Sequence, residues 1–286
     1  MSSKQYLRKP EWLKVKLPTK VEFSNTKKVL TSLNLNTVCQ SARCPNIFEC
    51  FSKKTATFLI LGKFCTRNCA FCKIEHFAPE PVDRDEPFRI LEAVKRLDLK
   101  YVVITSVTRD DLEDGGASQF QKVISLLKQH LSLKVEVLTP DFRGDFRSLE
   151  KVISSGPYVF NHNLETISRL YPKIRPQANY KQSLDVLEQA KKMDKSILTK
   201  SGLMLGLGEN KDEVKQTLED LKKAGCDWIT LGQYLQPTRY HFPVQRYVHP
   251  DEFEELKEFG QTLGLQVFAG PLVRSSYHAA ELLETN

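Results

Sequence analysis

The stretch TFLILGKFCTRNCAFC (57–72) joins a short apolar run, TFLIL (57–61), to three closely spaced cysteines. Five further apolar runs of strand type follow: YVVIT (101–105), KVEVL (134–138), YVFNH (158–162), ILTKSGLML (197–205) and WITLG (228–232). Between the runs, apolar residues recur at spacings of three and four, the pattern of an amphipathic helix. The helical segments are PFRILEAVKRLDL (87–99), SQFQKVISLLKQH (118–130), RSLEKVISS (147–155), YKQSLDVLEQAKKM (180–193) and KDEVKQTLEDLKKAG (211–225).

Six such strand–helix units in a row predict an α/β fold with a parallel sheet and helices outside it. The pattern alone leaves an open doubly wound sheet and a full or partial barrel as alternatives. A short strand and a helix are expected in the final segment, VFAGPLVRSSYHAAELLE (267–284). Residues 1–55 do not fit the repeat, so we expect an N-terminal extension there that packs onto the main domain.

The composition is that of a globular chain. Of 286 residues, 41% are hydrophobic and 27% are charged, which is enough apolar surface for a sizeable core. The chain has 42 Lys and Arg against 35 Asp and Glu, a net charge of +7, which fits an acidic protein partner, nucleic acid or neither. No stretch approaches the roughly 18 apolar residues of a membrane span. The start also lacks an apolar signal segment, so a cytoplasmic protein is expected.

Six of the seven cysteines form two tight triplets, Cys39/Cys44/Cys50 and Cys65/Cys69/Cys72, whereas Cys226 stands alone and is expected to pack in the core. Disulfides are unfavourable in a reducing compartment. Structural zinc usually has four ligands in two pairs, which two triplets do not supply. Three thiolates suit an iron–sulfur cube better, because they leave one iron open to a substrate or cofactor.

The second triplet resembles the signature of the radical S-adenosylmethionine superfamily. The spacing Cys65-x3-Cys69-x2-Cys72 follows directly after a strand, and the aromatic Phe71 precedes the last cysteine. The resemblance implies a partial (β/α)6 barrel, which agrees with the six units counted above. It also implies that the open iron binds S-adenosylmethionine, from which reduction produces a 5′-deoxyadenosyl radical.

The first triplet narrows the resemblance to the lipoyl synthase family. The segment VCQSARCPNIFEC (38–50) and the ending RSSY (274–277) are similar to that family's two signatures, and the similarity runs from about residue 8 to 280. It implies a sulfurtransferase that inserts two sulfur atoms at C6 and C8 of a protein-bound octanoyl group. Other implied matches are RKPEWLKVKLP (8–18), TSVTRDDLEDGGA (105–117), VFNHNLET (159–166), RLYPKIRPQANY (169–180), KSGLMLGLGE (200–209), LGQYLQPTRYHFPV (231–244) and FAGPLVRSSYHA (268–279).

The family resemblance assigns the metal ligands and three parts of the chain. Cys65, Cys69 and Cys72 would hold the radical [4Fe–4S] cluster. Cys39, Cys44, Cys50 and Ser276 would hold an auxiliary [4Fe–4S] cluster that donates sulfur. Without the resemblance, Ser275 or Ser276 is better explained as the N-cap of a helix. The parts are an extension over 1–55 with the auxiliary cysteines, a barrel over 56–245 and an extension over 246–286 with RSSY.

The resemblance also implies residues that bind S-adenosylmethionine, and each has a structural alternative. The set is Asp114, Gly115, Gly116, Asn163, Glu165, Arg175 or Lys200, Gly206, Gly208 and Glu209. The alternatives are a tight loop for the Asp-Gly-Gly segment, a solvated cation for Arg175 or Lys200, and strand-to-helix packing for the last three. These motifs follow strands, and loops after the strands of a parallel barrel share one end.

Partners follow from the same resemblance. We expect octanoylated lipoyl carrier domains, such as the glycine cleavage H protein or dehydrogenase E2 subunits, together with a ferredoxin- or flavodoxin-type reductant and a cluster-assembly carrier. No membrane and no nucleic acid are expected. The alternatives are another sulfur-inserting radical enzyme, one that methylthiolates tRNA or forms biotin, and a non-catalytic zinc module. The absence of a concentrated Lys/Arg stripe argues against RNA.

Overall fold

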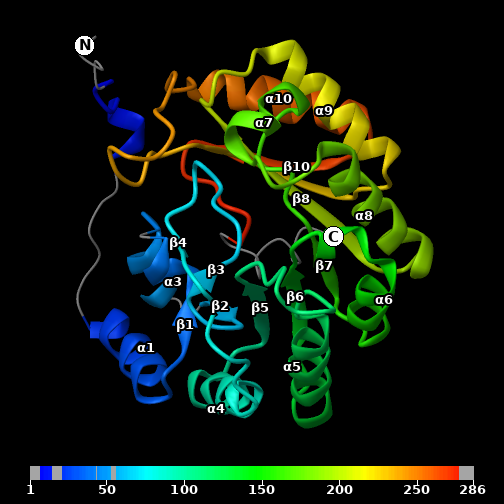
Figure 1. The fold of residues 1–286 in the computed structure, drawn as a ribbon. Coiled ribbons are helices and arrows are strands. Elements are labelled where there is room, and N and C mark those ends of the chain that lie inside the picture. Colours follow the sequence, from blue (N-terminus) through cyan, green and yellow to red (C-terminus); the bar gives the residue numbers. More distant parts are fainter. Residues whose placement is uncertain (1–6, 15–20, 43, 53–55, 277–286) are drawn as a thin grey trace.

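The computed structural model describes residues 7–14, 21–42, 44–52 and 56–276. Its main sheet has the order β1-β2-β5-β6-β7-β8-β9-β10, and every neighbouring pair is parallel except β1 and β2 (Figure 1). The strands are β1 Asn36–Thr37, β2 Thr57–Ile60, β5 Tyr101–Ser106, β6 Lys134–Leu138, β7 Val159–Asn161, β8 Leu198–Leu205, β9 Trp228–Gln233 and β10 Gln266–Gly270. Short strands β3 Phe64–Cys65 and β4 Glu75–His76 form a separate pair.

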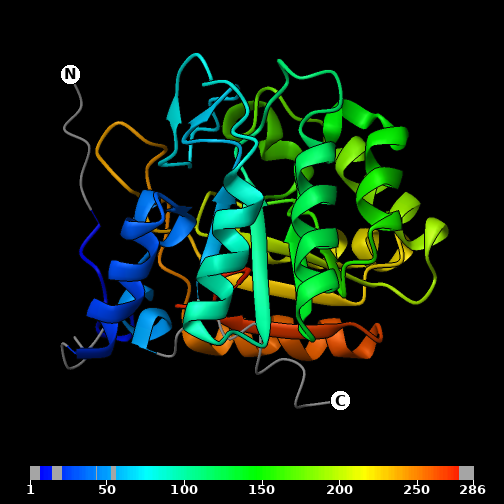
Figure 2. The same cartoon turned by 90° about the horizontal axis from the view of Figure 1, so that it is seen from below.

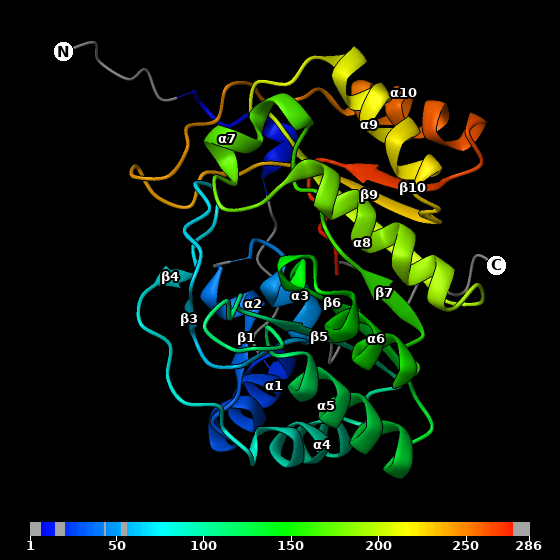
Figure 3. The same cartoon turned by 45° about the vertical axis from the view of Figure 1, so that its right-hand side comes forward.

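Helices cover the outer face of this curved sheet, as the sequence predicts (Figures 1 and 3). Those that follow strands are α4 Glu86–Leu97, α5 Ala117–His130, α6 Phe146–Ser154, α8 Tyr180–Met193, α9 Lys211–Lys223 and α10 Pro250–Thr262. The others are α1 Val21–Ser32, α2 Val38–Ser41, α3 Ile47–Ser52 and α7 Tyr171–Ile174, with 3-10 turns η1 Glu11–Leu13, η2 Phe142–Gly144 and η3 Ser168–Leu170. The partial barrel with parallel strands is thus confirmed.

Both extensions contribute to the sheet. The N-terminal extension supplies β1, which pairs with β2, and the C-terminal extension supplies β10, which pairs with β9. Helix α10 packs along β10 (Figure 2). The sequence did not predict α10, although Pro250 at its first turn and the buried Phe253 and Leu256 give it a readable helical pattern. The helix expected after Ser276 lies outside the described residues.

Alternation along each strand separates the core from the barrel interior. On β2, Phe58 and Ile60 are fully buried in the core, whereas Thr57 and Leu59, which alternate with them, line the cavity inside the barrel. On β5 the outward-facing Val102 and Ile104 flank inward-facing positions in the same way. Because successive side chains of a strand point to opposite faces, each apolar run contributes one set of residues to the core and the other set to the cavity wall.

A buried ion pair fills part of the barrel interior. The side chains of Glu136 on β6 and Lys200 on β8 are both 0% exposed, and their Nζ and Oε1 atoms lie 3.0 Å apart. Glu136 also accepts hydrogen bonds from the Tyr101 hydroxyl at 2.6 Å and from Asn161 Nδ2 at 3.1 Å. Both carboxylate oxygens are therefore satisfied, the condition under which a buried charge is tolerated.

Replacing Lys200 with Met is expected to destabilise the cluster-free protein by about 3–5 kcal/mol, because it leaves the Glu136 carboxylate buried without a counter-charge. Chemical denaturation measures the free energy of unfolding. The double variant Lys200→Met/Glu136→Gln removes both charges and should recover most of the loss. Equal stability of the wild type and the single variant would contradict this account of the pair.

Candidate functional site

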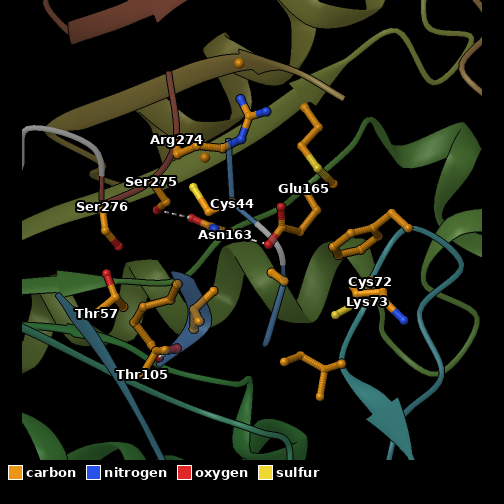
Figure 4. A pocket seen from close by; sticks show the side chains of 18 of the residues that line it. Cys44, Thr57, Cys72, Lys73, Thr105, Asn163, Glu165, Arg274, Ser275 and Ser276 are labelled. Atoms are coloured by element: carbon orange, nitrogen blue, oxygen red, sulfur yellow. Dashed lines mark hydrogen bonds between the residues drawn. The ribbon is translucent and has the colours of Figure 1, made fainter. Parts of the chain in front are cut away.

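A cavity of about 570 Å³ opens inside the barrel, and both cysteine triplets line it. The residues from the two predicted cluster sites that line it are Cys39, Cys44, Cys50, Cys65, Cys69, Cys72 and Ser276. Figure 4 shows this cavity with Cys44, Ser275 and Ser276 on one side and Cys72 and Glu165 on the other. The fold therefore gathers two triplets and the C-terminal serines around one space.

Two of the upstream cysteines lie on short helices, Cys39 on α2 and Cys50 on α3, and Cys44 lies between these helices. Cys39 is in α2, which begins at an N-cap, Thr37, whose hydroxyl accepts from the Gln40 amide. The amide of Cys44 donates to the Cys39 carbonyl at 3.0 Å, which fixes the turn between the two thiols. Burial raises the pKa of Cys39 to about 11 and also raises the pKa of Cys44. Both are neutral thiols at pH 7 in the absence of a metal.

The downstream triplet occupies the loop after β2. The Cys65 Sγ accepts from the backbone amides of Arg67 at 3.4 Å and Thr108 at 3.3 Å. The amide of Cys72 donates to the Cys69 carbonyl at 3.0 Å. Burial raises the pKa of Cys72 to about 12 and also raises that of Cys69. The two amides aimed at the Cys65 sulfur would stabilise its thiolate, the form that binds a metal.

Arg67 fixes this loop to the barrel, a role that sequence reasoning missed. Its guanidinium donates to both carboxylate oxygens of Asp110, at 2.7 and 2.9 Å, and to both of Asp141, at 2.8 and 2.7 Å. Although burial acts to raise the pKa of Asp141, the ion pair with Arg67 lowers it to about 2. Bidentate Arg–carboxylate pairs are strong and directional. Arg67 lies between the first two cysteines of FCTRNCAFC (64–72), and this position was the sequence feature that could have indicated its role.

Within the part of the chain that the structure describes, no three His, Cys, Asp or Glu side chains converge closely enough to share one metal ion. In an iron–sulfur cube each thiolate binds a different iron. The prediction that the triplets hold clusters rather than zinc continues to rest on their spacing in the sequence.

Three predicted S-adenosylmethionine residues line the cavity, and Glu165 lies on the same side as Cys72 (Figure 4). Asn163 and Glu165 follow β7 and line the cavity, and Asn163 Nδ2 donates to Glu165 Oε1 at 3.1 Å (Figure 4). Burial raises the pKa of Glu165, although the charge of Arg175 acts to lower it. Arg175 also lines the cavity and donates to the carbonyls of Asn163 and Leu164. Its buried Nε has no hydrogen-bond partner among the described residues.

The Asp-Gly-Gly segment is not among the described residues that line the cavity. Asp114 instead accepts from the amides of Gly116 and Ser118 at the start of α5. Gly116 has a φ of +91°, and a Cβ there would lie 2.2 Å from Leu61 Cδ1. The segment forms a tight loop before α5, and its contact with S-adenosylmethionine stays a prediction.

Lys200 and the GLGE segment also lie away from the described cavity lining. Lys200 is buried and paired with Glu136, so the alternative of a solvated cation is wrong for it. Glu209 accepts from the amides of Gly206 at 2.6 Å and Leu207 at 2.9 Å, which closes the loop after β8. A Cβ on Gly206 would lie 2.2 Å from Gln233 Nε2. Gly208, with a φ of +107°, belongs to the same turn.

Comparison with known proteins agrees with this geometry. Residues 59–221 match the model of the radical SAM superfamily, and residues 1–44 match that of the N-terminal domain of lipoyl synthase. A lipoyl synthase of Caldicellulosiruptor saccharolyticus is 56% identical over 276 residues, covering 96% of this chain and 97% of that protein. One of Aquifex aeolicus is 56% identical over 259 residues, covering 90% and 94%. The chain belongs to the lipoyl synthase family of radical S-adenosylmethionine enzymes.

Solved structures support the fold. Streptococcus suis SuiB bound to S-adenosylmethionine aligns with a TM-score of 0.59 at 14% identity, covering 86% of this chain and 60% of that one. Methylornithine synthase aligns with a TM-score of 0.55 at 14% identity, covering 85% and 81%. The family models and the lipoyl synthase relatives confirm the predicted family, fold, enzyme class and lipoyl synthase activity. They also confirm the predicted cofactors, which are S-adenosylmethionine and [4Fe–4S] clusters. No described helix has the length and apolar character to cross a membrane.

His162 gives the cavity wall a measurable acid sensitivity. It is 1% exposed, and its Nδ1 lies 2.9 Å from the Thr139 carbonyl. Burial, and then the charge of Arg175, lowers its pKa from 6.5 to about 4. In the unfolded chain the His162 ring binds a proton below about pH 6.5, whereas in the folded chain it does so only below about pH 4. This stability is fully present above pH 6.5 and is lost as the pH falls to 4.

The expected loss is about 3 kcal/mol, since one pKa unit corresponds to about 1.4 kcal/mol. Denaturation of the cluster-free protein at several pH values measures it. His162→Gln should flatten the profile between pH 6.5 and 4, whereas His130→Gln, at an exposed helix end, should leave it unchanged. Parallel profiles for the wild type and His162→Gln would rule out this assignment.

Proposed function

We propose that Cys65, Cys69 and Cys72 hold the cluster that binds S-adenosylmethionine, and that Cys39, Cys44, Cys50 and Ser276 hold the auxiliary cluster. The chain would thereby convert an octanoyl group on a lipoyl carrier domain into a lipoyl group by sulfur insertion at C6 and C8. The observation that carries this proposal is the single cavity of about 570 Å³ lined by both triplets. A sulfur donor and a radical source must both reach one substrate chain, and a shared cavity allows it.

When bound, S-adenosylmethionine and the two clusters supply the radical chemistry and the inserted sulfur. The chain's own residues orient the reactants and exclude water. Inward-facing Leu59, Leu138 and Met204 give the cavity wall an apolar part suited to an alkyl chain. Arg67 and its two aspartates hold the radical triplet in place. The neutral thiols must lose their protons as the metal binds, so cluster assembly favours higher pH.

Ser276, rather than Ser275, is proposed as the fourth ligand of the auxiliary cluster. The Ser275 hydroxyl accepts from Asn161 Nδ2 at 2.7 Å and donates to Asn163 Oδ1 at 3.0 Å. Among the described residues, no hydrogen bond engages the Ser276 hydroxyl, which lines the same cavity. A hydroxyl already committed in both directions is a poor metal ligand, which leaves its neighbour for that role.

S-adenosylmethionine is proposed to contact Asn163, Glu165 and Arg175. Arg175, which lines the cavity, would attract the methionine carboxylate by its charge, and the Asn163–Glu165 pair offers polar atoms to the amino group or ribose hydroxyls. His162 is a further candidate, because its buried Nε2 has no partner among the described residues. We assign Asp114, Gly116 and Glu209 instead to shaping the loops beneath the site.

The three-part division of the chain is proposed to separate these tasks: residues 1–55 supply the auxiliary cysteines, 56–245 the barrel, and 246–286 the RSSY ending. Partners are proposed to be octanoylated carrier domains of the glycine cleavage H protein or of dehydrogenase E2 subunits. A ferredoxin- or flavodoxin-type reductant and a cluster-assembly carrier would complete the cycle. The proposed location is the cytoplasm.

Anaerobic reconstitution followed by iron and acid-labile sulfide counting tests the cluster assignment. The wild type should hold about eight irons and eight sulfides, and the Cys65/Cys69/Cys72→Ala variant about half, since each triplet carries its own cube. Cys226→Ala is the matched control, because that buried thiol lies outside both triplets, and it should keep the full count. A single cluster, or zinc without labile sulfide, would require the proposal to be withdrawn.

Carrier binding is expected to weaken as salt rises. The net charge of +7 should attract an acidic carrier domain, and salt screens such attraction. Between low and physiological ionic strength the Kd should rise roughly three- to tenfold. Calorimetry with an octanoylated carrier measures it, and a neutral octanoyl-lysine peptide serves as the control. A Kd for the carrier that does not change with salt would remove electrostatic steering from the proposal.

A further inference from the structure

The C-terminal strap, residues 271–276, lies unusually close to the barrel. A Cβ on Gly232 of β9 would lie 2.1 Å from the Val273 carbonyl oxygen, so only glycine allows the strap to cross there. The Asn46 side chain, between the second and third cysteines of the upstream triplet, donates to the Leu272 carbonyl at 2.8 Å. The backbone is thus held by both the barrel and the N-terminal extension just before Ser275.

Ser275 joins the strap to the loop after β7. Its hydroxyl is placed between Asn161 Nδ2, at 2.7 Å, and Asn163 Oδ1, at 3.0 Å. Asn161 is 0% exposed and Asn163 is 8% exposed, so water does not easily replace either contact. Asn161 is itself held by Glu136. Because an amide nitrogen only donates, the Ser275 proton is directed at Asn163.

That proton sets which way the Asn163 amide points. With Oδ1 accepting from Ser275, Nδ2 faces Glu165 Oε1 at 3.1 Å (Figure 4). The flipped amide would turn Nδ2 toward the Ser275 hydroxyl proton, so that two donors would face each other. One hydroxyl on the strap therefore orients Asn163, which it contacts directly, and through Asn163 it orients Glu165.

We propose that Ser275 is a positioning residue that couples docking of the strap to S-adenosylmethionine binding, acting through Asn163 and Glu165. The inference rests on the proposed function, because it takes Asn163 and Glu165 as contacts of that ligand. A ligand that requires the observed Asn163 orientation binds better when Ser275 is docked. By linkage, the same ligand must hold Ser275, and with it the adjacent Ser276, in place. Binding of S-adenosylmethionine at one site and docking of the strap at the auxiliary-cluster site thus favour each other.

The first test uses the reconstituted wild-type protein without reductant, so that S-adenosylmethionine binds but is not consumed. Hydrogen exchange of residues 271–276 is followed with and without the ligand. Coupling requires the strap amides to exchange more slowly when the ligand is bound, by about five- to tenfold for a typical coupling between sites. Exchange in α4, which lies on the outer face, serves as the internal reference.

The second test compares variants by equilibrium binding of S-adenosylmethionine. Ser275→Ala should raise the Kd about five- to tenfold, and Ser275→Thr, which keeps the hydroxyl, should restore most of the affinity. The control is Ser148→Ala, which removes a buried serine hydroxyl of α6 that donates to the N-cap residue Asp145, away from the cavity lining. It should lower stability without changing the Kd.

The outcomes separate this inference from the proposed function. Ligand binding by the wild type without strap protection overturns the coupling and leaves the cluster assignments standing. An unchanged Kd in a folded Ser275→Ala variant does the same. No binding by a wild-type protein that holds both clusters overturns the proposed function and the coupling together. If Ser275→Ala does not fold, the exchange experiment on the wild type decides alone.

Discussion

The carboxylate of Glu136, buried inside the barrel, organises much of what surrounds it. It binds Lys200, Tyr101 and Asn161, which come from three other strands, and so ties the inward-facing positions of β5 to β8 together. Burying an ion pair costs desolvation free energy that apolar packing would not. The buried carboxylate instead fixes the orientation of Asn161, whose side-chain amide donates both to Glu136 and to the Ser275 hydroxyl. A continuous set of hydrogen bonds thereby runs from the barrel interior to the strap.

Arg67 plays the corresponding part on the radical side of the cavity. Its guanidinium joins the cysteine loop to Asp110 after β5 and Asp141 after β6, so the loop takes its position from two strands of the barrel. The backbone of the same loop is held by the Ile174 carbonyl, which accepts from Ala70 at 2.9 Å, and by His241 Nε2, 2.9 Å from the Cys72 carbonyl. The cysteines are thus placed by contacts that do not involve a metal. Such a preformed loop reduces the ordering cost of ligation.

Sequence predicts the parts of this protein that depend on local pattern. The six inner strands and five of the helices follow from apolar periodicity, and the cysteine spacing indicates where metal binds. Strand β1 is only two residues long, too short to carry a pattern. Sequence leaves a ligand contact or a solvated cation open for Lys200, because it does not show that β8 sets Lys200 against Glu136, two strands away in the sheet. The Ser275 contacts span more than a hundred residues, and only the closed barrel brings them together.

The thiol pKa values bear on how an auxiliary cluster can be consumed without loss of the fold. Burial raises the pKa of Cys39 to about 11 and also raises the pKa of Cys44, so both thiols are uncharged when no metal is bound. Uncharged thiols can remain buried at little cost, whereas buried thiolates could not. The strap and the upstream helices are also held by Asn46, Gly232 and Ser275, none of which requires a cluster. The cavity can therefore keep its shape after the sulfur donor is spent, which leaves the three cysteines in position to receive a new one.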